Sequence, residues 1–178
     1  ITEASFTYDN CFCSVDILKN DEDMVEIYEV KSSTGVRDIY LDDASYQCYV
    51  LSNIGLNVKK VAIVHINNKY IREKELDLNQ LFKVEDITDI AISKQSEIRN
   101  NIEQINEFMK EHDEQNEPDM GIGVHCFNPY LCDFWDYCTK DLPKPNVFDV
   151  NGMQIPDKFK NYNEGKISFE DLANEDIN

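Results

Sequence analysis

The sequence predicts an α/β (α+β) domain in which helices flank a mixed sheet, followed by a small cysteine-containing lobe. Residues 4–31 alternate as three short strands, helical spacing begins near Leu41, and a β-branched run follows at 58–66. Three cysteines gather near the end of the chain. We therefore expect a main domain at 1–115 and a cysteine lobe with a C-terminal tail at 116–178.

The first part predicts a three-stranded meander over 4–8, 11–18 and 24–31, because apolar and polar residues alternate there and polar turns separate the runs. Side chains alternate across a strand, so the second run has two predicted faces. One face carries Cys11, Cys13, Val15 and Ile17, and the other carries Phe12, Ser14, Asp16 and Leu18.

The pattern then changes to helical. Apolar residues recur at helical spacing over 41–51, and Gly55 suits the position after the helix end. The run VKKVAIVHI predicts a buried central strand, followed by a turn and a short run at 70–72. A long helix is predicted over 86–112, then an acidic linker, the cysteine lobe and a final short helix capped by Ser168 and Asp171.

Charge limits the possible partners. The chain has 35 Asp and Glu against 17 Lys and Arg, a formal net charge of −18, and such a surface repels a polyanion at long range. A nucleic-acid partner therefore requires local basic patches, metal ions or a basic partner segment. No apolar run approaches the roughly 20 residues of a membrane span. No secretory signal is visible, so we expect a cytoplasmic protein without a membrane partner.

Two acids and a lysine form the first candidate site. Residues two apart on a strand point the same way, so Glu29 and Lys31 should project together, with Val30 on the opposite face. Hairpin pairing should bring Asp16 close to Glu29. Two carboxylates and a backbone carbonyl, that of Val30, would form a hard oxygen site suited to Mg²⁺ or Mn²⁺.

Such a site can hydrolyse phosphodiesters, because the ion holds a phosphate oxygen and acidifies a bound water. Lys31 would contact the scissile phosphate or orient the water, and Gln47 on the next helix could hold the lysine or the phosphate. The competing interpretation is a surface Glu–Lys pair that stabilises little. We assign Asp42 and Asp43 to the start of the helix, where carboxylates suit the dipole, rather than to metal binding.

The cysteines fall into two groups. Cys126, Cys132 and Cys138 form a Cys-x5-Cys-x5-Cys pattern among aromatic residues, which suits one soft metal centre. Zinc with His125 as fourth ligand, or plain packing of reduced thiols, are the alternatives. We expect core positions for Cys11, Cys13 and Cys48, and a structural role for His65.

Three segments resemble the PD-(D/E)xK nuclease superfamily: VDIL at 15–18, EVKSST at 29–34 and DASYQCYVL at 43–51. The likeness is strongest to the RecB-type branch, which includes CRISPR-adaptation and AddB-like nucleases that carry an iron–sulfur cluster. The chain is also similar to a bacterial family that joins such a module to a further C-terminal domain. This resemblance extends from residue 4 to about residue 172.

The resemblance implies a restriction-endonuclease-like fold that hydrolyses DNA, with metal ligation by Asp16 and Glu29, catalysis by Lys31 and support from Gln47. It implies a [4Fe–4S] cluster on the three clustered cysteines, completed by a cysteine upstream of Ile1. It also implies a helix before the first strand and a further domain of the same parent chain as partner. The sequence then represents a fragment, and whether it is active without the rest of its parent chain stays open. A degenerate, non-catalytic scaffold and a metal-cluster-binding interaction module remain the competing functions.

Overall fold

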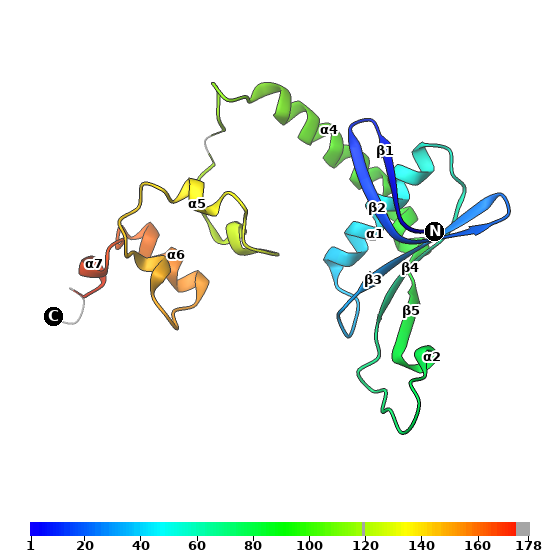
Figure 1. The fold of residues 1–178 in the computed structure, drawn as a ribbon. Helices are drawn as coiled ribbons and strands as arrows, with labels where there is room; N and C mark the ends of the chain where they lie inside the picture. Colours follow the sequence, from blue (N-terminus) through cyan, green and yellow to red (C-terminus); the bar gives the residue numbers. More distant parts are fainter. Residues whose placement is uncertain (119, 174–178) are drawn as a thin grey trace. The chain divides into compact units, whose positions relative to one another are not determined.

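The computed structural model describes residues 1–118 and 120–173 in two compact units, Ile1–Asp113 and Glu114–Asn178 (Figure 1). The first unit contains β1 (Thr2–Tyr8), β2 (Cys11–Asp21), β3 (Met24–Lys31), α1 (Asp38–Asn53), β4 (Val58–Ile66), α2 (Leu78–Leu81), β5 (Phe82–Asp86), α3 (Thr88–Ser93) and α4 (Gln95–Glu111). The second contains the 3₁₀ helices η1 (Val124–Phe127) and η2 (Val147–Asp149), with the α-helices α5 (Trp135–Cys138), α6 (Ile155–Asn163) and α7 (Phe169–Ala173).

The first unit is built on a five-stranded mixed sheet in the order β1-β2-β3-β4-β5. All neighbouring strands are antiparallel except β3 and β4, which run parallel because α1 connects them. The predicted meander, helix and central strand are therefore confirmed, and the fold is of the mixed α and β type. Gly55, with a φ of 91°, follows the end of α1 as predicted.

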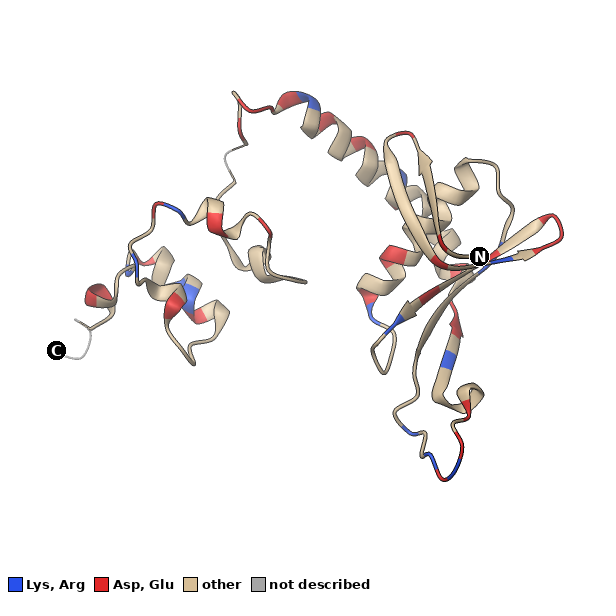
Figure 2. Ribbon diagram, viewed as in Figure 1, with Lys and Arg blue, Asp and Glu red and all other residues tan. Residues whose placement is uncertain are grey.

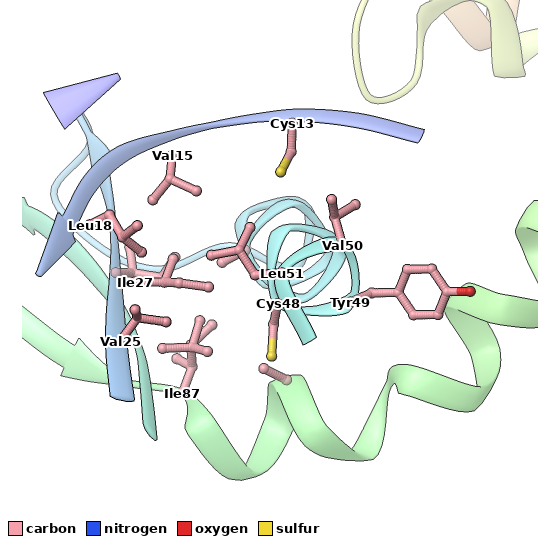
Figure 3. Packing of buried hydrophobic residues seen from close by; sticks show 14 of the residues in the cluster. Cys13, Val15, Leu18, Val25, Ile27, Cys48, Tyr49, Val50, Leu51 and Ile87 are labelled. Atoms are coloured by element: carbon pink, nitrogen blue, oxygen red, sulfur yellow. The ribbon is translucent and has the colours of Figure 1, made fainter. Parts of the chain in front are cut away.

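The core lies where α1 packs on one face of the sheet, with α3 and α4 beside it. Figure 3 shows strand residues such as Val15 and Ile27 directed toward Val50 and Leu51 of α1. Full burial of an aliphatic side chain of this size contributes about 1.5–3 kcal/mol. Three cysteines expected in the core are buried there, and the prediction is confirmed for Cys11, Cys13 and Cys48.

The facing of β2 differs from the prediction at one point. Val15 and Leu18 both lie in the core, whereas Ile17 is 40% exposed. Side-chain alternation therefore shifts by one residue between Val15 and Leu18, and the prediction that Ile17 shares a face with Val15 and that Leu18 lies on the other face was wrong. Opposite this shift, Glu3 of β1 has a positive φ of 52°, which shows that the neighbouring strand is also irregular there.

The predicted long helix over 86–112 was wrong in two respects. Asp86 ends strand β5, which pairs antiparallel with β4, and the helical stretch that follows is interrupted at Lys94 between α3 and α4. All five residues of β5 are exposed, and only Phe82 and Val84 alternate with polar residues, which is too short a pattern to indicate a strand. The predicted run at 70–72 forms no regular element and lies in the long connection from β4 to α2.

The second unit has a small aromatic core. Phe127, Trp135, Phe148 and Phe159 contact one another edge to face, with ring centroids 4.7–6.3 Å apart. Its C-terminal helix begins at the predicted cap: Asp171 accepts hydrogen bonds from the backbone N–H of Ser168 at 2.7 Å, and Ser168 Oγ accepts one from the N–H of Asp171 at 3.1 Å. No helix in residues 1–118 or 120–173 has the length and apolar character needed to cross a bilayer.

Candidate functional site

Strand β3 presents Glu29 and Lys31 on the face that α1 covers. Glu29 is 6% exposed, and Lys31 Nζ lies 2.7 Å from Glu29 Oε1. Val30 between them is 40% exposed. The two side chains thus project together, as the alternation of a strand requires.

Asp16 lies on β2, and its side chain contacts the same part of β3. The paired register of β2 and β3 begins at Ile17 and Tyr28, so Asp16 lies just beyond the ladder. Its carboxylate replaces a backbone acceptor: the N–H of Val30 donates to Asp16 Oδ2 at 2.7 Å. The side chain of Asp16 is therefore held against the peptide that follows Glu29.

Helix α1 contributes Gln47 and Asp43, which lie one turn apart. Gln47 Nε2 donates to Glu29 Oε2 at 2.7 Å and to Asp43 Oδ1 at 3.4 Å. Lys31 Nζ donates to Asp43 Oδ2 at 2.6 Å. Gln47 thus holds the glutamate, whereas the sequence suggested that it could hold the lysine or the phosphate.

Asp43 is the residue that sequence reasoning missed. It had been assigned to the start of the helix, but α1 begins at Asp38 and Asp43 lies in its second turn. The available signal was its spacing of four residues from Gln47, which places both side chains on one helix face. We call Asp16, Glu29, Lys31, Asp43 and Gln47 the acid–lysine cluster.

Burial and hydrogen bonding have opposing effects on the pKa values of Glu29 and Lys31 in this cluster. Burial raises the pKa of Glu29 above its ordinary value despite the hydrogen bonds from Lys31 and Gln47, and the nearby charge of Asp43 raises it further. Burial disfavours the charged form of Lys31, but its hydrogen bonds to Asp43 and Glu29 outweigh that effect and raise its pKa. Both carboxylates therefore favour the charged form of Lys31.

One buried atom of the cluster has no partner. Gln47 is 3% exposed, and its Oε1 accepts no hydrogen bond from the described residues. The orientation of the amide is set by its neighbours, because Glu29 and Asp43 both present acceptors and so require the NH₂ group. A buried, unpaired carbonyl oxygen is costly, which suits a place that a water or another ligand completes.

His65 lies beside this cluster but is already engaged. It is the register partner of Lys31 across β3 and β4 and is only 2% exposed. Its Nε2 lies 2.9 Å from Glu85 Oε1, and its Nδ1 lies 3.1 Å from the carbonyl oxygen of Ile66. Both ring nitrogens therefore have oxygen partners, which confirms the expected structural role.

The three cysteines of the cysteine lobe are less closely gathered than the residues of the acid–lysine cluster. Cys126 is buried, whereas Cys132 and Cys138 are exposed. Backbone hydrogen bonds join the segment, including one of 2.7 Å from the N–H of Cys132 to the carbonyl of Cys126. Throughout the described ranges, no three His, Cys, Asp or Glu side chains come together as a group that could hold a metal ion. Metal binding by these three thiolates would require them to move together.

Acidic residues are spread over both units, and basic ones are few (Figure 2). The connection from β4 to α2 illustrates this mixture, because Arg72 and Lys74 alternate there with Glu73 and Glu75. Comparison with known proteins adds no further constraint: no family model, curated protein or solved structure matches the chain.

Proposed function

We propose that the first unit is a divalent-metal-dependent nuclease module that hydrolyses DNA phosphodiesters, with the restriction-endonuclease-like arrangement that the sequence motifs suggest. The observation that carries this proposal is the buried Glu29, which shares its surroundings with a second carboxylate, a fixed ammonium and an unpaired amide oxygen. Buried carboxylates with raised pKa values concentrate at functional sites.

The donor set fits Mg²⁺ or Mn²⁺. Mg²⁺ usually binds one or two carboxylates and completes its shell with waters and substrate phosphates, so a cage of three acidic side chains is unnecessary. Asp16 and Glu29 would hold the ion, together with the backbone carbonyl of Val30. The ion would supply Lewis-acid activation of the phosphodiester and of a water.

The protein's own groups have separate tasks. Lys31, kept charged by Asp43 and Glu29, would donate to a non-bridging phosphate oxygen and stabilise the charge that develops there. Gln47 orients Glu29 through its Oε2. Asp43 is a positioning residue, because it contacts Lys31 and Gln47 together.

Metal titration and cleavage test this proposal on the purified protein. Calorimetry should detect Mn²⁺ binding that Glu29→Gln abolishes, and cleavage of labelled DNA should require Mn²⁺ or Mg²⁺ and cease with chelator. Glu26→Gln is the matched control, because Glu26 is a buried glutamate on the same strand whose partners are Tyr28 and Lys19. Cleavage that persists at full rate in Glu29→Gln would refute the assignment.

The principal rival is a non-catalytic scaffold. It is favoured by the closed network of the acid–lysine cluster, in which both oxygens of Glu29 already accept hydrogen bonds. In that case Mn²⁺ would produce no binding heat, and Glu29→Gln would change only stability.

A metal cluster on Cys126, Cys132 and Cys138 is proposed independently of catalysis. Anaerobic purification followed by iron, sulfide and zinc analysis tests it. Iron with equimolar sulfide and broad visible absorption supports [4Fe–4S], whereas zinc alone supports the alternative with His125. A preparation free of all three would leave the thiols with only a packing role.

A further inference from the structure

Next to the acid–lysine cluster lies a cation that its carboxylates do not neutralise. Arg37 directly precedes α1 and is exposed, and its guanidinium carbon lies 5.8 Å from the ring centroid of Tyr40. Lys31 Nζ lies 5.3 Å from the centroid of that same ring. Both distances fall within the range of cation–π attraction. Tyr40 therefore links Arg37 to the site.

The two cations differ in their partners. Lys31 forms ion pairs with Glu29 and Asp43, so its charge is balanced within the cluster. In the described part of the chain, no carboxylate lies within ion-pair distance of Arg37. The unpaired guanidinium of Arg37, next to the carboxylates of the acid–lysine cluster, is the local positive charge that an acidic protein needs in order to hold a polyanion.

The position of Arg37 is fixed from both sides. The connection from β3 to α1 is tied to the sheet, because the N–H of Ile66 donates to the carbonyl of Ser33 at 2.9 Å and Ser33 Oγ donates to the carbonyl of Gly35 at 2.8 Å. Val36 and Tyr40 pack against the hydrophobic core. The guanidinium thus extends from an anchored turn over a partly buried ring, which reduces the entropy lost on binding.

We propose that Arg37, supported by Tyr40, binds a phosphate of the substrate strand next to the phosphate that is cut. This inference rests on the proposed nuclease function and identifies which part of the site holds the strand. A guanidinium binds phosphate oxygens through two parallel N–H groups, so it fixes the strand's direction as well as adding charge. Lys31 and Arg37, which both lie near the ring of Tyr40, would then contact successive phosphates.

Equilibrium binding tests the proposal apart from catalysis. A dye-labelled single-stranded DNA oligonucleotide is titrated with protein by fluorescence anisotropy, with Ca²⁺ in place of Mn²⁺, at several salt concentrations. Arg37→Ala should weaken binding roughly tenfold, as expected for loss of a charge-assisted contact. It should also reduce the slope of log K against log salt by about 0.7, the value for one phosphate contact on a single strand.

Matched variants separate a phosphate contact from general effects. Arg99→Ala removes an exposed arginine on α4 and should leave both affinity and salt slope unchanged. Tyr40→Phe keeps the ring and should bind like the wild type. Tyr40→Leu should weaken DNA binding, but by less than Arg37→Ala does. Its melting temperature must first show that the variant is folded.

The outcomes distinguish the two proposals. If Arg37→Ala binds like Arg99→Ala while the wild type cleaves DNA, the role of Arg37 is wrong and the nuclease function stands. Loss of binding in Arg37→Ala, with no cleavage by the wild type under any divalent ion, supports a phosphate-binding scaffold and removes catalysis. Absence of oligonucleotide binding by the wild type overturns both.

Discussion

Strand β3 carries two buried glutamates whose surroundings differ sharply. Glu26 is 5% exposed and accepts from the hydroxyl of Tyr28 and from Lys19 at 3.1 Å. Those hydrogen bonds lower its pKa below the ordinary value. Glu29 is 6% exposed, yet burial raises its pKa, and a second acid lies beside its lysine.

The difference separates a structural ion pair from a candidate site. Around Glu26 the charges balance, because Lys19 and Lys59 both approach it and Asp21 also pairs with Lys59. Around Glu29 the carboxylates outnumber the lysine, so an added cation would find favourable charge there. Burial and residue type are the same, and the surplus of negative charge around Glu29 is the difference on which the proposed metal site rests.

The largest expected effect is on catalysis. Lys31→Ala should reduce cleavage roughly 10²–10³-fold at saturating substrate, because it removes a fixed donor to the developing phosphate charge. Single-turnover cleavage in Mn²⁺ measures this. Lys19→Ala removes the equivalent partner of Glu26 and should retain the wild-type rate. Equal losses in the two variants would show that the site lies elsewhere.

Gln47→Leu should lower the free energy of unfolding by about 1–3 kcal/mol, because it leaves Glu29 Oε2 buried without its donor. Urea denaturation at neutral pH provides the measurement. Gln104→Leu, an exposed change on α4, controls for side-chain type. A stability gain in Gln47→Leu would mean that the unpaired Oε1 dominates the energetics of this residue.

The two glutamates should respond oppositely to pH. A carboxyl whose pKa is raised on folding contributes stability at acid pH that disappears as the pH rises, whereas a lowered pKa contributes stability above the ordinary carboxyl range. Relative to the wild type, Glu29→Gln should therefore gain stability between about pH 4 and neutrality. Glu26→Gln should lose stability relative to the wild type as the pH rises toward the ordinary carboxyl pKa value of 4.5, and the deficit should then stay constant up to neutrality. Parallel curves in chemical denaturation would contradict the comparison.

The smallest expected effect belongs to Asp43→Asn. Removing this charge lowers the pKa of Glu29, so the acid limit of Mn²⁺ binding should move to lower pH by less than about one unit. A titration of Mn²⁺ affinity against pH detects the shift. Asp42→Asn is the adjacent control, since Asp42 pairs with Lys94 at 2.8 Å outside the cluster. A shift toward higher pH would exclude this role for Asp43.

Residues close in sequence were predictable, and those joined by packing were not. Strand alternation placed Glu29 beside Lys31, and helical spacing located α1 with Gln47. Asp43 was missed because its contact with Lys31 depends on how α1 lies across the sheet, which no local pattern encodes. Strand β5 was missed because all its side chains are exposed and its pairing with β4 is a backbone property.

The shift in β2 makes the site sensitive to chain length. Because Val15 and Leu18 both face the core, the two intervening residues are released from the strict alternation, and one of them can bond to the backbone of β3. Removing Asp16 would restore a regular strand, with Ile17 alone between two core residues and no carboxylate at this place. A variant shortened by Asp16 should therefore fold into the same sheet with its entire core intact, yet lack the oxygen atom that meets Val30.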